Sequence, residues 1–332
     1  MEDWSEQRVL VTGGAGFIGS AIVWELNRRG CENIVVADLL GTSEKWRNLS
    51  ALRFADYLEG PDLFPRLQRD ALGRFDLVIH LAACSATTER DSSYLVRNNF
   101  EFTKDLAEWC LKNGARFTYA SSAATYGDGS AGMDDGTEHL DRLRPLNAYG
   151  WSKHVFDQHA RRRGWLKDIV GLKYFNVFGP NEDHKGDMRS VVHKSFAQVL
   201  SEGVIRLFRS HRPDYQDGEQ QRDFLYVKDA AAMTLHLAAT RSANGLFNLG
   251  SGEAHSWNEL ARAIFAALGK EPKIEYIEMP EALRGKYQYY TRADVSRLRA
   301  TGYTAAITPL EVSVADYVKN YLVPDRRLGD EK

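Results

Sequence analysis

With 332 residues, the chain is long enough to bury the core of one large domain or of two modest ones. Its hydrophobic fraction of 43% and its charged fraction of 27% are ordinary for a globular protein. A net charge of −2 at pH 7 argues against nucleic-acid binding, which usually requires an excess of basic residues.

The chain starts with MEDWSEQ, which is acidic and polar and therefore unlike a secretory signal peptide. No apolar run approaches the roughly 20 residues of a membrane span. Cys31, Cys84 and Cys110 are widely spaced and odd in number, so they indicate neither a disulfide framework nor a metal site. We therefore expect a cytoplasmic protein that binds no metal, no nucleic acid and no membrane.

Strand-like and helical patterns alternate through the first half of the chain. RVLVTG (8–13) ends in glycine, and the stretch 17–29 then places apolar residues at helical spacing. Further apolar runs predict buried strands at 33–38, 76–83, 115–122 and 168–179. Helical patterns lie at about 98–113 and 147–163. Repeated strand–helix–strand units with nearly continuous apolar strands predict a parallel sheet covered on both faces by helices.

The second half of the chain is more mixed. A predicted helix at about 189–202 leads to the short strand IRLF and then to the polar run RSHRPDYQDGEQQ. The segments 223–239 and 245–252 indicate a return to the main sheet. An amphipathic helix from about residue 257 and the strand KIEYIEMP follow.

These patterns predict an α/β fold, in which a Rossmann-type, doubly wound parallel sheet carries a smaller, discontinuous α/β substrate-binding lobe. We expect the dinucleotide-binding domain at 1–176 and about 222–256. The substrate-binding lobe is expected at about 177–221 and 257–332.

A glycine-rich turn, VTGGAGFIGS, places Gly13, Gly16 and Gly19 directly after a predicted strand and at the start of a helix. Glycines allow a tight turn and close approach of the backbone, and the helix N-terminus then faces a pyrophosphate. A glycine pattern alone is a weak signal, but the strand and helix that flank this one supply the context it requires. The turn therefore predicts a dinucleotide site.

The second predicted strand ends at Asp38, where a carboxylate that binds the cofactor ribose belongs. By itself, Asp38 would favour NAD, because it accepts a hydrogen bond from the 2′-hydroxyl and repels a 2′-phosphate. Lys45 and Arg47 follow within a short loop and could neutralise such a phosphate. The sequence therefore leaves NADP and NAD both open.

Tyr149 and Lys153 in NAYGWSK are four residues apart on a predicted helix, so they share one face. A nearby ammonium stabilises the phenolate and lowers the pKa of a tyrosine towards a range useful for proton transfer. Ser122 ends a predicted strand at the carboxyl edge of the sheet, where ligands bind in such folds. These three residues are candidate catalytic groups, although a tyrosine–lysine pair alone would only indicate a solvated helix face.

The glycine spacing and the serine, tyrosine and lysine together resemble the extended branch of the short-chain dehydrogenase/reductase family, the NAD-dependent epimerases and dehydratases. The resemblance implies catalytic roles for Ser122, Tyr149 and Lys153. It also implies a set of cofactor contacts. They are Gly13, Gly16, Phe17, Ile18, Gly19, Asp38, Leu39, Lys45, Leu81, Ala82, Ala83, Cys84, Ser85, Asn98, Lys153, Val177 and Lys185.

Several segments are similar to the family of ADP-L-glycero-D-manno-heptose 6-epimerases, from about Arg8 to Tyr317. They are VTGGAGFIGS, ACSATTE, YASSAATYG, PLNAYGWSK, YFNVFGPNEDHKGDM, RDFLYVKD, FNLGSG and LRGKYQ. HKG after the NVFGP turn, together with ACSATTE, is more specific than the glycine turn that the whole superfamily shares.

This resemblance implies epimerisation at C6 of ADP-D-glycero-β-D-manno-heptose to ADP-L-glycero-β-D-manno-heptose through a transient 6-ketone, with a tightly bound NADP or NAD regenerated in each cycle. Two proton-handling groups are useful because the alcohol is presented in two orientations. Tyr149 matches one and Lys185 the other. A lysine that acts as a base must be partly neutral, which requires burial or neighbouring positive charge. The alternative for Lys185 is a loop lysine that binds phosphate.

The resemblance also implies a set of substrate contacts. They are Ser122, Asn176, Asp187, Lys194, Phe208, Arg209, Ser210, His211, Arg222 and Tyr287. Two features depart from the family pattern: the run RSHRPDYQDGEQQR is several residues longer, and Asp187 stands where a small residue is expected. A homo-oligomer, with a pentamer as the suggested assembly, and a role in building the lipopolysaccharide inner core are further implications.

Three other functions are alternatives to this one. A 4,6-dehydratase would need an acid and a base after Ser122, but the chain has Ala123 and Ala124 there. A 4-epimerase of another sugar nucleotide fits the residues, although it does not explain HKG. A non-catalytic dinucleotide-sensing protein would not need Ser122, Tyr149 and Lys153, all of which are present.

Overall fold

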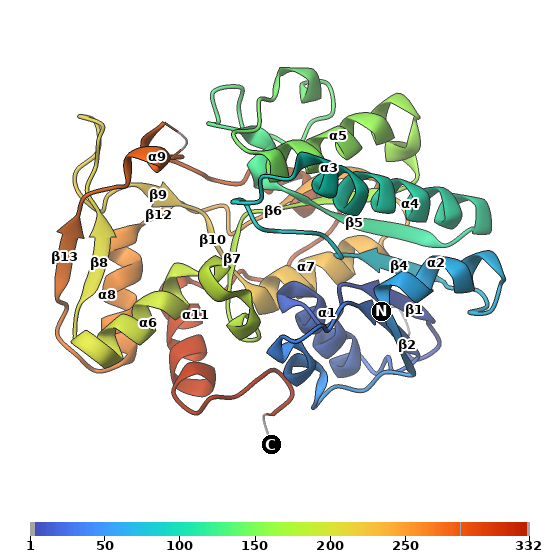
Figure 1. The fold of residues 1–332 in the computed structure, drawn as a ribbon, viewed down its shortest axis with the longest axis horizontal. Coiled ribbons are helices and arrows are strands. Elements are labelled where there is room, and N and C mark those ends of the chain that lie inside the picture. Colours follow the sequence, from blue (N-terminus) through green and yellow to red (C-terminus); the bar gives the residue numbers. More distant parts are fainter. Residues whose placement is uncertain (1–3, 286, 331–332) are drawn as a thin grey trace.

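Seven strands form one parallel sheet in the order β11-β6-β5-β4-β1-β2-β3 in the computed structural model, which describes residues 4–285 and 287–330 (Figure 1). Their bounds are Val9–Thr12 (β1), Ile34–Asp38 (β2), Asp56–Glu59 (β3), Leu77–His80 (β4), Arg116–Ser122 (β5), Val170–Tyr174 (β6) and Gly245–Leu249 (β11). In the centre, Val11 of β1 pairs with Val36 of β2 and with Ile79 of β4. The strand order reverses at β1, which creates the crevice where ligands bind in doubly wound folds. The predicted Rossmann-type fold is therefore confirmed.

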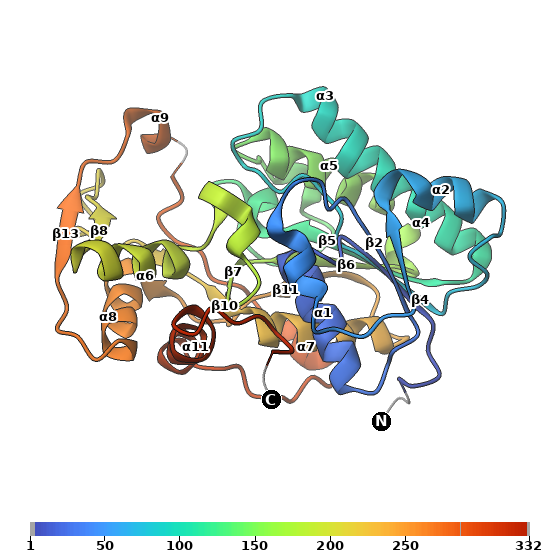
Figure 2. The same ribbon diagram turned by 60° about the horizontal axis from the view of Figure 1, so that its bottom comes forward.

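Helices cover both faces of this sheet (Figure 2). On one face lie α1 (Phe17–Arg28) and α7 (Val227–Ala239), and on the other α2 (Gly60–Gln68), α4 (Phe102–Asn113) and α5 (Ala148–Arg162). Successive strand residues point to opposite faces. Val9 and Val11 accordingly pack with α1 and α7, while Leu10 packs with α2, α4 and α5. Both faces are thus buried, as the continuous apolar strands predicted.

The predicted strand 168–179 is divided into two by a change of partner at Phe175. The Phe175 N–H donates to the carbonyl of Leu249 in β11 (2.9 Å), whereas the Asn176 N–H donates to the carbonyl of Asp223 (3.2 Å). The chain then forms β7 (Asn176–Phe178), which pairs with β10 (Phe224–Tyr226) in a separate two-stranded sheet. The predicted return of 223–239 to the main sheet is therefore wrong for its strand, and β11 alone makes that return.

A smaller group of elements lies beside the sheet, on the left in Figure 1. It includes the helices α6 (Val191–Glu202), α8 (Trp257–Ala267), α9 (Glu281–Arg284) and α11 (Leu310–Tyr317). Its strands form two pairs: β8 (Ile205–Phe208) with β13 (Ile274–Ile277), and β9 (Gln221–Arg222) with β12 (His255–Ser256). Ser256 and Glu259 form a capping box that starts α8. By contrast α10 (Ser296–Ala300) packs through Leu298 against the β6–β11 edge of the main sheet.

Several regular elements were not predicted, among them β3 in the main sheet, α2 beside it and α11 of the smaller group. The edge strand β3 has only one buried residue, so no apolar alternation marks it. The helix α2 contains Pro61 near its start and Pro65 inside it, and prolines usually predict a break. The remaining short helices are η1 (Glu44–Leu49), α3 (Ser92–Leu95), η2 (Val96–Glu101), η3 (Ala123–Tyr126), η4 (Leu140–Arg142), η5 (Trp165–Lys167), η6 (Asp183–Met188) and η7 (Val318–Leu322). No helix in the described part of the chain has the length and apolar character needed to span a bilayer.

Candidate active site

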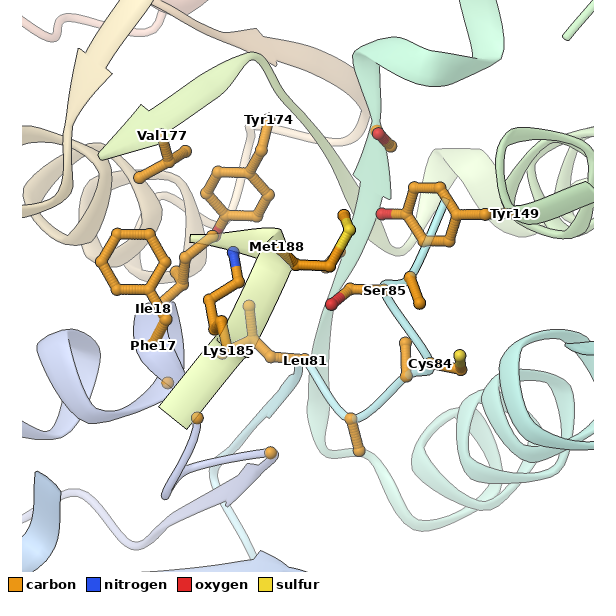
Figure 3. A pocket seen from close by; sticks show the side chains of 18 of the residues that line it. Phe17, Ile18, Leu81, Cys84, Ser85, Tyr149, Tyr174, Val177, Lys185 and Met188 are labelled. Atoms are coloured by element: carbon orange, nitrogen blue, oxygen red, sulfur yellow. The ribbon is translucent and has the colours of Figure 1, made fainter. Parts of the chain in front are cut away.

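A cavity of about 1060 Å³ lies at the carboxyl ends of the central strands (Figure 3). It is lined by all of the residues predicted to contact the cofactor, from Gly13 in the glycine turn to Lys185 in η6. Ser122, Tyr149 and Asn176 line it as well. Residues that are far apart in the sequence, such as Gly13 and Lys185, thus share one cavity at the reversal of the strand order.

The glycine turn requires its glycines for steric reasons. Gly13 has a φ of +72°, and a Cβ at this position would lie 2.6 Å from the backbone nitrogen of Ala82. A Cβ on Gly19 would lie 2.0 Å from the carbonyl oxygen of Gly13. The turn closes with a hydrogen bond from the Gly16 N–H to the same carbonyl (3.0 Å), after which α1 begins. The result is a narrow cradle at a helix N-terminus, which fits a pyrophosphate.

Asp38 lies beside this cradle and is only 7% exposed. One of its carboxylate oxygens accepts a hydrogen bond from the Ala15 N–H (2.8 Å), and the other lies 2.5 Å from the Lys45 ammonium. Arg47, the second cation considered near the ribose, instead pairs with Asp325 (3.3 Å) and does not line the cavity. Of the two predicted cations, Lys45 is therefore the one placed to meet a ribose phosphate.

Tyr149 and Lys153 lie one turn apart on α5, whose N-cap Asn147 accepts a hydrogen bond from the Gly150 N–H (2.8 Å). A Cβ on Gly150 would lie 2.7 Å from the carbonyl oxygen of Ala124, so this glycine lets α5 approach the end of β5 closely. The approach brings Tyr149 within hydrogen-bonding reach of Ser122.

The environment shifts the pKa values of both groups on α5. Burial raises the pKa of Tyr149, while the hydrogen bond with Ser122 opposes that rise. Burial lowers the pKa of Lys153 to about 8, against the opposing charge of Asp157. An ammonium of lowered pKa beside a phenol is suited to share and move a proton near neutral pH.

A buried charge network lies behind these groups and was not foreseen from the sequence. The Asp157 carboxylate accepts hydrogen bonds from Tyr119 (2.8 Å), Ser121 (2.7 Å) and the ammonium of Lys173 (2.7 Å). Lys173 also donates to Thr125 Oγ1 (2.7 Å), in η3 directly after β5. Lys173 and Asp157 are 1% and 0% exposed, so the pair is fully desolvated. Its one visible signal in the sequence was an aspartate on the buried face of α5.

Lys185 lies in the short 3₁₀ segment η6 and contacts the face of the Phe17 ring, 5.1 Å from its centroid. Burial lowers the pKa of Lys185, and the positive charge of Lys194 contributes in the same direction, against the opposing charge of Glu182. In Figure 3, Tyr149 and Lys185 approach the cavity from opposite sides. This arrangement offers two groups for proton transfer on the two sides of one ligand.

The far end of the cavity is aromatic. Phe224 and Trp257 line it, and the Trp257 indole N–H donates to the Tyr287 hydroxyl (2.8 Å). The Arg222 guanidinium is 6% exposed and stacks on both rings, at 5.6 Å from the Trp257 centroid and 5.0 Å from that of Tyr287. Arg222 and Tyr287 therefore lie in the layer directly behind the cavity wall.

The other predicted substrate contacts do not line the cavity. They are Asp187, Lys194, Phe208, Arg209, Ser210 and His211. Asp187 is exposed, and its carbonyl accepts a hydrogen bond from Lys194 (3.4 Å). Arg209 and His211 instead lie near Glu278, at 3.7 Å and 3.4 Å. The longer run after β8 turns towards the segment that contains Tyr289, whose hydroxyl accepts from the His211 N–H (3.0 Å).

Sequence reasoning missed a residue that shapes the cofactor side of the cavity. Asn99 is 0% exposed; its side chain accepts from the Cys84 N–H (2.8 Å) and donates to the Cys84 carbonyl (2.9 Å). It also donates to Ser152 Oγ (3.0 Å) and so ties this loop to α5. A second asparagine directly after Asn98, within a helical pattern, was the available signal. No group of three or more potential metal ligands occurs in residues 4–285 and 287–330.

Comparison with known proteins gives the family. Residues 9–250 match the model of the NAD dependent epimerase/dehydratase family. This chain belongs to that family. Among curated relatives, a Nitratidesulfovibrio vulgaris protein named ADP-L-glycero-D-manno-heptose-6-epimerase is 54% identical over 314 residues, which covers 94% of this chain and 97% of the relative.

Solved structures of epimerases share the fold. An ADP-L-glycero-D-manno-heptose-6-epimerase of Helicobacter pylori superposes with a TM-score of 0.80 at 28% identity, covering 96% of this chain and 97% of the other. A Thermus thermophilus UDP-glucose 4-epimerase in complex with NAD gives a TM-score of 0.74 at 28% identity, covering 95% and 100%. As a member of the epimerase/dehydratase family, the chain uses a nicotinamide dinucleotide, and the glycine cradle beside Asp38 fits one.

Proposed function

We propose that this protein is an isomerase that epimerises C6 of the heptose in ADP-D-glycero-β-D-manno-heptose, giving ADP-L-glycero-β-D-manno-heptose. The observation that carries this proposal is the placement of Tyr149 and Lys185 on opposite sides of a cavity that also contains a dinucleotide cradle. A relative with the heptose-epimerase name, 54% identical over nearly its whole length, supports the choice of substrate.

The first proton-handling set is Tyr149 with Ser122 and Lys153. In its phenolate form Tyr149 takes the proton of the C6 hydroxyl, and Ser122 orients the reacting oxygen by a hydrogen bond. The Lys153 ammonium stabilises the phenolate, because opposite charges in a buried site attract strongly. The dinucleotide, when bound, accepts a hydride from C6 and returns it.

The second proton-handling group is Lys185. After the substrate becomes a 6-ketone, the carbonyl must present its other face before the hydride returns. An oxygen that now points to the other wall of the cavity needs a different proton donor, and Lys185 lies on that wall. Burial lowers the pKa of Lys185, which makes its ammonium a better proton donor than that of an exposed lysine.

For the cofactor we propose NADP, with NAD as the weaker ligand. The Lys45 ammonium sits 2.5 Å from the Asp38 carboxylate, so the negative charge that would repel a 2′-phosphate is largely neutralised. The same lysine can then contact the phosphate directly.

For the substrate we propose that the nucleotide lies towards the aromatic end of the cavity. Trp257 offers an aromatic surface in this wall, and we propose that Arg222, which stacks behind it, reaches a diphosphate as a bidentate donor. The smaller group of elements around α6 and α8 then serves as the substrate-binding lobe. The homo-oligomer, and the pentamer in particular, stay predictions.

The proposal is tested with purified protein and ADP-D-glycero-β-D-manno-heptose, followed by proton NMR, first without and then with added NADP or NAD. Appearance of the C6 epimer without net reduction of nicotinamide is the expected result. No conversion under any of these conditions, together with turnover of a UDP-hexose, would replace it by a 4-epimerase.

A further inference from the structure

The turn that carries Lys185 begins with residues that are fully buried. Asn181 and Glu182 are each 0% exposed, although Gly186 and Asp187, a few residues later, are exposed. The Asn181 backbone has a φ of 77°, in the left-handed region that asparagine tolerates better than most residues. A buried residue in this conformation fixes the direction in which the chain enters the turn. The partners of Asn181 therefore help to determine where Lys185 lies.

Three separate segments hold Asn181. Its side-chain amide donates to Ser20 Oγ in α1 (3.0 Å), and its backbone carbonyl accepts from the side chain of Asn48 (3.1 Å). Its side-chain oxygen accepts from the backbone N–H of Leu328 (3.0 Å), a residue that is 0% exposed. One of the three segments thus comes from the far end of the chain, 147 residues later.

Residues 325–330, the C-terminal strap, also contact this turn through a charged group. Arg327 is 6% exposed, and its guanidinium lies 3.3 Å from the carboxylate of Asp183, two residues before Lys185. Burial alone would raise the pKa of Asp183, but a hydrogen bond with His193 and the charge of Arg327 lower it overall. The contact is therefore an ion pair at neutral pH between a buried guanidinium and a half-buried carboxylate.

The strap has a second attachment, to the helical segment η1. Asp325 pairs with Arg47 (3.3 Å), and a Cβ on Gly329 would lie 3.1 Å from that of Ala51, just after η1. Asn48 of η1 in turn donates to the Ala15 carbonyl in the glycine turn (3.0 Å). The strap therefore connects η1 with η6, and each of these segments carries one lysine of the cavity.

We propose that the C-terminal strap is a positioning element for Lys185, whose contacts with Asn181 and Asp183 fix where the turn places the amine. This inference rests on the proposed role of Lys185 as the second proton-handling group. The strap touches neither α5 nor Ser122 in any contact described above. A change in the strap should therefore alter catalysis through Lys185 and leave the Tyr149 side of the cavity intact.

Two adjacent arginines provide a matched pair of variants, because Arg327 is buried and Arg326 is exposed. We expect Arg327→Ala to lower kcat about 10- to 100-fold, since a misplacement of about 1 Å can cost about 100-fold. Arg326→Ala should change kcat by no more than about twofold. Arg327→Lys, which keeps the charge, should recover part of the loss.

A double-mutant cycle separates positioning from a general structural effect. In a Lys185→Met background, Arg327→Ala should cause no further loss of kcat, because the group that it positions is already absent. In a Tyr149→Phe background the full loss should appear. The same loss in both backgrounds, or no loss in the wild type, would overturn the proposal.

A readout without substrate keeps this inference separate from the proposed function. Reductive methylation with formaldehyde and cyanoborohydride, followed by peptide mass spectrometry, reports the reactivity of each lysine. Lys185 should be labelled several-fold faster in Arg327→Ala than in the wild type or Arg326→Ala, while Lys153 stays unchanged. Unaltered labelling of Lys185 would remove the strap as a positioning element. A wild type that labels as expected but converts no ADP-heptose would contradict the function alone.

Discussion

Tyr149 and Lys185 face one cavity from two sides that are built in different ways. Tyr149 lies on a 15-residue helix whose N-cap, glycine contact and lysine partner are all within a few residues of it. Lys185 lies on the six-residue turn η6; Asn181 before it contacts α1, η1 and the C-terminal strap, and Asp183 within it contacts α6 and the strap. The spacing of Tyr149 and Lys153 on α5 is determined by local sequence, whereas the position of Lys185 depends on contacts between distant segments.

This difference predicts which substitutions act only near their own position and which act on a distant side chain. On a helix, residues four apart share a face whatever the rest of the chain does. A short turn has no such internal order, so its geometry depends on its anchors. Substitutions on α5 should therefore affect either a single catalytic candidate or the stability of the whole fold. Substitutions far from Lys185 in the sequence, by contrast, can change the position of its side chain.

The largest effect should come from removing both proton-handling groups. Tyr149→Phe together with Lys185→Met should lower kcat by at least about 10⁴-fold, while each single change leaves measurable activity, about 10²- to 10³-fold below the wild type. Single-turnover NMR with the ADP-heptose gives the comparison. NADP binding, followed by fluorescence, should stay within about threefold and shows that the double variant is folded. Substantial activity in the double variant would contradict the proposal that Tyr149 and Lys185 are the two proton-handling groups.

The next effect concerns stability on the Tyr149 side. Asp157→Asn leaves Lys173 buried without its counter-ion and should lower the free energy of unfolding by about 3–5 kcal/mol. Asp141→Asn, which removes an exposed pair with Arg161, serves as control and should leave the midpoint unchanged. Chemical denaturation of the two variants measures the contrast. Equal midpoints would mean that the buried pair does not support this side.

A smaller effect should show how Lys153 controls the pKa of Tyr149. Lys153→Met removes the ammonium that stabilises the Tyr149 phenolate, so the pKa of Tyr149 rises further. The acid limb of kcat/KM should therefore move to higher pH, and activity at pH 7 should fall about 100-fold. A pH profile between 6 and 10 tests the direction. An acid limb that stays in place would assign it to another group.

The smallest effect should be on cofactor choice. Lys45→Ala should weaken NADP about 10-fold, because one contact with the 2′-phosphate and the neutralisation of Asp38 are lost. NAD should change by no more than about twofold, since the ribose hydroxyl can use the freed carboxylate. Titration calorimetry with both cofactors measures the two constants. An equal loss of affinity for NADP and NAD would mean that Lys45 does not recognise the 2′-phosphate.

The sequence predicted the features that depend on local spacing. The glycine turn follows from its local spacing, the strands β1, β2, β4 and β5 from continuous apolar runs, and the Tyr149–Lys153 pair from the helical repeat of about four residues. The predicted cofactor contacts all line the cavity, and most of them follow strands of the parallel sheet, whose carboxyl ends meet at one edge.

Features that depend on distant partners were not predictable in this way. The stretch FGPNEDHKGDM is polar and turn-prone in composition, yet Asn181 and Glu182 in it are fully buried. Nothing local shows that Leu328 and Arg327 will contact them. The longer run 209–222 likewise turns towards Tyr289, so Arg209 and His211 lie away from the cavity.

The placement of the strap also bears on the order in which the protein matures during translation. Six of the seven sheet strands, with Ser122, Tyr149 and Lys153, lie within the first 174 residues. Because N-terminal regions fold first as a chain leaves the ribosome, this side can assemble while the rest is still being synthesised. The strap emerges about 150 residues later. The segments that anchor the Lys185 turn are therefore complete only after the Tyr149 side has been synthesised.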